Sequence, residues 1–286
     1  MKLNKKIIMG GAQFGMKYGI ANKTGEISSK KLNQILNYAA NNKMTLIDTA
    51  TSYDKSLKKI FEVTQKKRLK KKFRVIIKVN DLSSLQFIEF EKLFLHFDVY
   101  CIMAHSSEIF LTKTFQKKIK LLRKIFKFKI GVSIYENKEL EKLKQFYNMI
   151  NIIQIPYNII NFKNFDDKIF HRLKKNKIEL HARSIFYQGV LLMNENKVKK
   201  LFKKFSINFI RLKSLSKINK IDLNFLCIKF VQNQNFFDKW VFGFDSLRQL
   251  KEIIKNINSK KKIPDKILDY VKKTDLSSNL PDPRNF

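Results

Sequence analysis

The sequence is poor in cysteine, proline and glycine. Only two of its 286 residues are cysteines, and Cys101 and Cys227 lie far apart inside apolar segments. This spacing argues against a disulfide framework or a zinc ribbon, and it indicates a reducing compartment. The four prolines and eight glycines form no linker that would divide the chain. We therefore expect a single domain over residues 1–286.

Long apolar runs are also missing. Near the amino-terminus the apolar stretch at residues 7–9 is far shorter than the core of a signal peptide. No other apolar run in the sequence is long enough to cross a bilayer. We therefore expect a soluble, cytoplasmic protein without a membrane partner.

Acidic residues are scarce beside basic ones, with 24 Asp and Glu against 59 Lys and Arg and a net charge of +35. Such a charge can indicate a polyanion partner, and a basic scaffold for RNA or an acidic membrane is one hypothesis. The excess is mostly Lys spread along predicted helix faces, and it accompanies many Asn, Ile and Phe residues, a set that A+T-rich codons favour. No nucleic-acid-binding motif accompanies it. We expect no specific nucleic-acid partner.

Short segments rich in β-branched residues alternate with longer segments of helical period. The candidate strands are residues 5–10, 45–49, 74–79, 98–104, 129–135, 151–157, 178–184 and 239–244. The amphipathic segments between them include residues 29–42, 82–96, 115–126, 138–147, 166–175 and 222–234. This α/β alternation predicts a closed (β/α)8 TIM barrel, which needs about this length of chain. A doubly wound open sheet is the alternative.

Two segments do not follow the alternation. Residues 188–224 are too long for an ordinary loop between a strand and a helix, so we expect short extra helices that overhang the barrel mouth. Residues 276–286 contain two prolines, and we expect an irregular tail there.

Reactive side chains follow three neighbouring predicted strands. Asp48 ends the second strand and Tyr53 comes five residues later, Lys78 ends the third strand, and His105 follows the fourth. Each has an ordinary structural explanation when taken alone, such as a helix cap or a solvated charge. Lys78 is the hardest to explain in that way, because it stands in an apolar strand where a cation needs a carboxylate such as that of Asp48.

Together these four residues make chemical sense. A phenol has a pKa near 10, and a neighbouring ammonium would lower that pKa towards neutral pH, which makes Tyr53 a better proton donor. Asp48 would hold Lys78 in place, and a neutral His105 could donate a hydrogen bond to a carbonyl oxygen. Such a set is suited to protonating a carbonyl group that receives a hydride from another source.

Several segments in the same order resemble the aldo-keto reductase superfamily over nearly the whole chain. They are GGAQFGMKYGIANKTGEIS, LIDTATSY, IIKVN, MAHSS, GVSIY, QIPYNIIN, HARSIFYQGVLLM and VFGFDSLRQLKEI. The resemblance implies a (β/α)8 barrel and NAD(P)H-dependent reduction of aldehydes or ketones. It also implies that Tyr53 is the general acid, Lys78 the residue that lowers its pKa, Asp48 the partner of Lys78, and His105 the orienting group.

The resemblance further implies a set of cofactor-binding positions. They are Gly11, Gln13, Phe14, Ser133, Gln154, Arg183, Ser184, Gln188, Gly189, Gly243, Ser246 and Gln249. Arg183 stands where many members have an aromatic residue, and it could stack on the nicotinamide or bind the pyrophosphate. Asp245 stands near the position of a Lys or Arg that grips the 2′-phosphate of NADP. The choice between NADPH and NADH is therefore open, and no metal is implied.

The sequence thus predicts an enzyme that acts on a small-molecule carbonyl compound, for which a sugar derivative is one option. The alternative is a non-catalytic barrel that binds a nucleotide as a sensor or interaction subunit, because a fold alone does not guarantee activity. We expect a monomer or a weak homo-oligomer.

Overall fold

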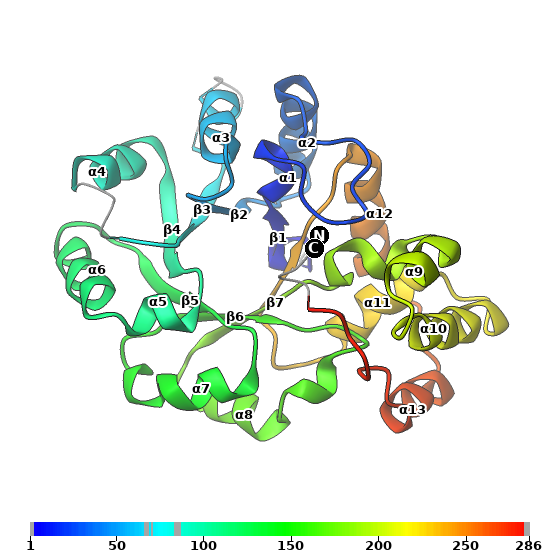
Figure 1. Ribbon diagram of the computed structural model, residues 1–286. Helices are drawn as coiled ribbons and strands as arrows, with labels where there is room; N and C mark the ends of the chain where they lie inside the picture. Colours follow the sequence, from blue (N-terminus) through cyan, green and yellow to red (C-terminus); the bar gives the residue numbers. More distant parts are fainter. Residues whose placement is uncertain (1–2, 66–68, 70, 83–86, 283–286) are drawn as a thin grey trace.

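Eight parallel strands close into a barrel, with the helices on its outside (Figure 1). The computed structural model describes residues 3–65, 69, 71–82 and 87–282. The strands are β1 (Ile7–Gly10), β2 (Leu46–Ala50), β3 (Arg74–Val79), β4 (Asp98–Ala104), β5 (Lys129–Ser133), β6 (Ile152–Pro156), β7 (Glu179–Arg183) and β8 (Lys239–Phe242). Each pairs with the next, and β8 closes the ring on β1 with Met9 opposite Phe242. The predicted TIM barrel is confirmed, and the open-sheet alternative is wrong.

The helices connect successive strands and cover the barrel. The α-helices are α1 (Ala12–Gly15), α2 (Ser29–Asn41), α3 (Ser56–Thr64), α4 (Phe87–His96), α5 (Ser107–Leu111), α6 (Lys113–Ile125), α7 (Asn137–Leu143), α8 (Asp167–Lys175), α9 (Glu195–Leu201), α10 (Ser206–Ile218), α11 (Leu223–Gln232), α12 (Leu247–Asn258) and α13 (Asp265–Lys273). Short 3-10 helices are η1 (Leu3–Lys6), η2 (Lys144–Phe146), η3 (Phe162–Asn164) and η4 (Tyr187–Leu192).

Side-chain caps fix where several helices begin. The hydroxyls of Ser28, Thr112 and Ser246 accept hydrogen bonds from backbone N–H groups in the first turns of α2, α6 and α12. Asp166 and Asp222 do the same for α8 and α11. These bonds satisfy N–H groups that have no partner within the helix, so the polar residues before each apolar stretch set its start.

The long segment after β7 contains η4, α9 and α10, so the expected extra helices are present. One of them is not short, because α10 has 13 residues. The predicted helix at 82–96 is described from Phe87 onward, and residues 83–86 lie outside the described part of the chain.

The carboxy-terminal segment runs from α13 back towards the barrel mouth (Figure 1). Residues 275–282 contain turns and no helix or strand. The Tyr187 hydroxyl donates a hydrogen bond to the Pro281 carbonyl at 2.5 Å, which ties this segment to the loop after β7. The last four residues of the predicted tail, 283–286, lie outside the described residues.

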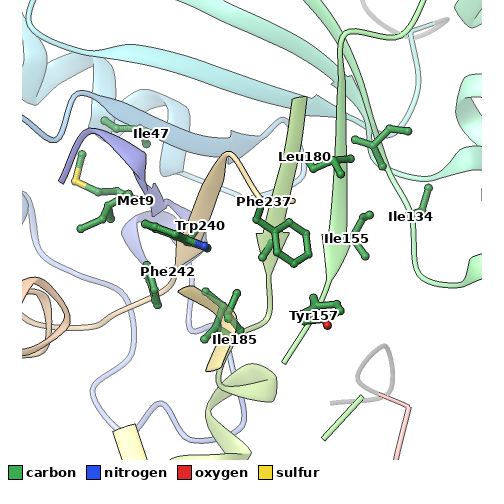
Figure 2. Packing of buried hydrophobic residues seen from close by; sticks show 14 of the residues in the cluster. Met9, Ile47, Ile134, Ile155, Tyr157, Leu180, Ile185, Phe237, Trp240 and Phe242 are labelled. Carbon is green, nitrogen blue, oxygen red and sulfur yellow. The ribbon is translucent and has the colours of Figure 1, made fainter. Parts of the chain in front are cut away.

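The main hydrophobic core lies between the strands and the surrounding helices. Figure 2 shows part of this layer, in which Trp240 and Phe242 of β8 lie beside Met9 of β1. All three side chains are at most 3% exposed. Side chains alternate across a strand, so the residues next to these three on β1 and β8 point into the barrel. Ile8 and Val241 are two of them, and they belong to a smaller interior core. The same alternation aims polar residues at the interior near the strand ends.

A charged cluster fills the barrel at the amino-terminal ends of the strands. The Glu179 carboxylate accepts hydrogen bonds from Lys129 and Lys239 at 2.5 Å, from Tyr100 at 2.7 Å, and contacts His181 Nε2 at 2.9 Å. Burial by itself raises the pKa of this carboxyl, but hydrogen bonds from His181, Lys129 and Lys239 outweigh burial and hold the pKa well below its usual range. This end of a TIM barrel serves stability, since reacting groups lie at the opposite end.

The two cysteines are buried free thiols. Across the described residues, no helix has both the length and the apolar character needed to span a membrane. The same residues contain no group of three or more His, Cys, Asp and Glu that could hold a metal ion.

Candidate active site

A cavity of about 490 Å³ opens at the carboxyl ends of the strands. Asp48, Tyr53, Lys78 and His105 all line it, so the structure brings the four predicted reacting residues to one place. Its volume is in the range of small-molecule and cofactor sites. A second hollow of about 540 Å³ lies on the outer surface beside α6 and η2, and it contains none of the predicted site residues.

Asp48, in the middle of β2, and Lys78, near the end of β3, form a buried ion pair. Lys78 Nζ lies 2.8 Å from Asp48 Oδ1, and the two side chains are 5% and 3% exposed. Gln154 on β6 donates a hydrogen bond from Nε2 to the other carboxylate oxygen, Asp48 Oδ2. A buried charge is tolerated only when it is paired and hydrogen-bonded, and this arrangement meets both conditions.

The turn that carries Tyr53 is held against the first loop of the barrel. Ser56 is fully buried, and its hydroxyl donates a 2.8 Å hydrogen bond to the Gly11 carbonyl. Gly15 packs so closely that a Cβ there would lie 2.1 Å from Ser56 N and 2.5 Å from the Tyr53 carbonyl oxygen. Only glycine allows this approach, so Gly15 and Ser56 position Tyr53. Sequence reasoning missed both residues.

Three rings meet at the centre of the site. The ring centroids of Tyr53 and His105 are 6.0 Å apart and their planes are nearly perpendicular, at 80°. Tyr18, from the loop after α1, lies with its centroid 6.0 Å from that of Tyr53. Tyr18 also lines the cavity and was not predicted. The phenol of Tyr53 therefore faces a site bordered by one imidazole and one further phenol.

The pKa of Tyr53 is raised, whereas the sequence predicted that it would be lowered. Burial is the main cause that raises the pKa of Tyr53 above its ordinary value, and the Asp48 carboxylate adds to it, while Arg183 opposes the rise. The expected lowering by Lys78 is not found, because Asp48 balances the ammonium charge at 2.8 Å. Tyr53 is therefore a protonated phenol at neutral pH, which is the form that a proton donor needs.

His105 is neutral at physiological pH. Burial, followed by the positive charges of Lys78 and Arg183, lowers the pKa of its imidazole to about 4. Its Nδ1 atom forms a hydrogen bond with the Asn80 side-chain oxygen. If the Asn80 amide is rotated by 180°, its NH2 group donates to Nδ1, and the proton then resides on Nε2. Asn80, which was not predicted, thus decides which His105 nitrogen can donate to a ligand.

Most of the expected cofactor positions line the cavity. They are Gly11, Gln13, Ser133, Arg183, Ser184, Gln188, Gly189, Gly243 and Gln249. Three others do not. Phe14 is fully buried and packs on Phe244, Gln154 is fully buried against Asp48, and Ser246 caps α12 by accepting a hydrogen bond from Gln249 N.

Arg183 extends from the end of β7 across the mouth of the barrel towards β5. Its guanidinium donates to Ser133 Oγ at 3.2 Å, to the Ile134 carbonyl at 2.9 Å and to Ser184 Oγ at 3.3 Å. The guanidinium carbon lies 4.4 Å from the centre of the Tyr135 ring, so the two groups stack. Ser133, an expected nicotinamide contact, is therefore engaged by Arg183 in this arrangement.

The chain is similar to known proteins in part of its sequence and in its fold. A sequence model of the Aldo/keto reductase family matches residues 6–124, the segment that holds Asp48, Tyr53, Lys78 and His105. The amino-terminal part of the chain thus matches the aldo/keto reductase family. A crystal structure of a Pseudomonas aeruginosa protein assigned to the aldo-keto reductases superposes with a TM-score of 0.62. The alignment covers 88% of this chain and 89% of that one at 12% identity, which supports a common fold. None of the curated proteins matches the chain in sequence.

Aldo/keto reductases use NAD(P)H, and the cavity offers groups that fit a dinucleotide. Gln154 does not line the cavity, but its buried Oε1 has no hydrogen-bond partner among the described residues and so lacks the bond that a carboxamide NH2 would supply. Gly10 and Gly243 line the cavity, and neither adds a side chain to its wall. The backbone can therefore approach a ligand closely at this point.

The end of the cavity beside α11 and α12 is acidic. Asp222, Asp245 and Glu252 line it together with Arg248. In the part of the chain that the structure describes, none of the three carboxylates forms an ion pair within 4 Å. A ligand group at this end meets more negative than positive charge, which disfavours a second phosphate there.

Proposed function

We propose that this chain is a single-domain aldo/keto reductase that reduces an aldehyde or ketone to an alcohol with NAD(P)H. The observation that carries the proposal is the juxtaposition, in one cavity, of a buried Asp48–Lys78 ion pair with Tyr53 and His105. The family match over residues 6–124 supports the same reaction class. The two buried free thiols are compatible with the expected cytoplasmic location.

The nicotinamide, when bound, supplies the hydride. Tyr53 holds a proton on its hydroxyl and donates it to the carbonyl oxygen as negative charge develops there. Neutral His105 orients that oxygen through a hydrogen bond from Nε2, which requires the Asn80 amide to turn its NH2 group, and not its oxygen, towards Nδ1. The positive charge of Arg183 stabilises the phenolate that remains, and Asp48 holds Lys78 in position.

Ser133 and Gln154 are the proposed partners of the nicotinamide carboxamide. Gln154 would use its free Oε1, and Ser133 would exchange its hydrogen bond with Arg183 for one with the ligand. At the opposite end, Gly243 and Gln249 would lie along the adenosine half of the cofactor. We favour NADH over NADPH, because Asp245 and Glu252 would repel a 2′-phosphate.

The decisive experiment compares wild type with Tyr53→Phe. Fluorescence titration with NADH should give dissociation constants within about threefold of each other, because the phenol acts on the carbonyl and not on the cofactor. Oxidation of NADH by a panel of aldehydes and sugar derivatives should fall at least 100-fold in the variant. Equal turnover in the two proteins would refute the acid assignment. Binding of NADH without turnover in wild type would favour the nucleotide-binding sensor.

A further inference from the structure

Arg183 is a cation of the candidate site that has no carboxylate partner among the described residues. Its three hydrogen bonds go to two hydroxyls and one carbonyl, and its stacking partner is the neutral ring of Tyr135. No ion pair to Arg183 occurs within 4 Å in residues 3–65, 69, 71–82 and 87–282. Lys78, the other cation of the cavity floor, is neutralised by Asp48 at 2.8 Å.

The charge of Arg183 reaches the proposed reacting groups. Burial and then Lys78 are the larger causes of the lowered His105 pKa, and Arg183 adds to them. Arg183 also opposes the effect of burial on the pKa of Tyr53 and of Tyr18. A charge that acts on all three rings lies beside the point where a carbonyl group must sit to receive a proton from Tyr53.

The guanidinium retains donors for a ligand. It has five N–H groups, and the structure uses one on Nε and one on each terminal nitrogen. Within the described part of the chain, two N–H groups have no acceptor, one on each terminal nitrogen, and a carboxylate or phosphate can accept from both. Desolvation of a half-buried cation costs free energy that an anionic ligand would offset, whereas a neutral ligand would not.

The distribution of charge in the cavity separates this role from cofactor binding. The acidic residues Asp222, Asp245 and Glu252 line the end where the adenosine half would lie. Arg183 lies instead against Ser133, the proposed partner of the nicotinamide, and its charge acts on the pKa values of Tyr53 and His105. A pyrophosphate lies between the nicotinamide and adenosine halves of the cofactor, so it does not belong beside the reacting carbonyl.

We propose that Arg183 makes the enzyme selective for carbonyl compounds that carry an anionic oxygen group, a carboxylate or a phosphate, next to the reacting carbon. This inference rests on the proposed reductase function. It assigns Arg183 to the substrate, whereas the resemblance assigned this position to the cofactor.

The test uses matched pairs of substrates with wild type, Arg183→Met and Arg183→Lys. The carboxylate arm compares glyoxylate with glycolaldehyde, and the phosphate arm compares glyceraldehyde 3-phosphate with glyceraldehyde. In at least one arm, kcat/KM should favour the anionic member in wild type, and this preference should fall about 10- to 100-fold in Arg183→Met, mainly through KM. Arg183→Lys should keep part of the preference that Arg183→Met loses, because lysine keeps the positive charge but lacks the paired N–H donors of the guanidinium.

Arg172→Met is the matched control, because Arg172 lies on the surface of α8 and pairs with Glu141. It should leave the preference unchanged. An anionic preference that is absent in wild type, or unaltered in Arg183→Met, would overturn the proposal. A rise in the NADH dissociation constant of Arg183→Met with an unchanged preference would return Arg183 to the cofactor.

A second readout does not need turnover. Calorimetric titration with benzoate and phenyl phosphate should show saturable binding to wild type that is at least tenfold weaker in Arg183→Met. If wild type reduces no carbonyl but shows this Arg183-dependent binding, the reductase function fails and the anion site stands. If neither probe binds in an Arg183-dependent way, the anion site fails whatever the enzyme does.

Discussion

Replacement of Lys78 by methionine tests whether the buried ion pair is held together as the structure indicates. The variant keeps most of the apolar stem and removes the ammonium that lies 2.8 Å from Asp48 Oδ1. Asp48 is 2% exposed, and only Gln154 then remains among its observed donors. An uncompensated buried charge of this kind destabilises a protein by about 3–5 kcal/mol. For a chain of this length that corresponds to a decrease in melting temperature of about 6–10 °C.

The assay is urea-induced unfolding, followed by the fluorescence of Trp240. It is the only tryptophan of the sequence, and it is buried on β8, so it reports opening of the barrel. The double variant Asp48→Asn/Lys78→Met removes both charges and should recover at least half of the lost stability. Lys138→Met, which removes one partner of an exposed surface pair with Glu136, is the control and should cost no more than about 1 kcal/mol.

Two outcomes would contradict this reasoning. If Lys78→Met is no less stable than Lys138→Met, the Asp48 carboxylate does not depend on its partner. If the double variant is as unstable as the sum of its two single variants, the two charges do not interact.

Two further outcomes follow from charges in the cavity. Asp245→Lys should raise the affinity for NADPH relative to NADH by about tenfold, measured by fluorescence titration, and an unchanged ratio would mean that Asp245 does not face the 2′ position. The pKa of His105 is lowered to about 4 from 6.5, so between these pH values the unfolded chain binds a proton that the folded protein excludes. Lowering the pH from 6.5 to 4 should therefore reduce the free energy of unfolding by at most about 3 kcal/mol. In denaturant titrations the variant His105→Asn should lack this part of the pH dependence, provided that the substitution costs little stability at pH 8.

The strands were predictable because each is rich in β-branched residues and each is followed by a segment of helical period. β3 and β4 have the predicted bounds, whereas the predicted strand at 129–135 ends two residues early, at Ser133. α3 was predicted only as a helix face at residues 57–61, without bounds, and its start at Ser56 has no side-chain cap. Helix starts without a polar cap leave no local signal, so such a helix is recognised only from its packing.

The reacting residues were predictable for a different reason. Lys78 is a cation in an apolar strand, and such a residue is costly without a partner, so its type and position alone identify it. Ser56, Gly15 and Asn80 have no such signal. They act through contacts with Gly11, Tyr53 and His105, and these contacts depend on how distant loops meet.

The pKa of Tyr53 shows where local reasoning stops. A lysine near a phenol lowers the pKa of that phenol only while the lysine charge is unbalanced, and here Asp48 balances it. Arg183 supplies the unbalanced charge instead, because its hydrogen-bond partners are neutral.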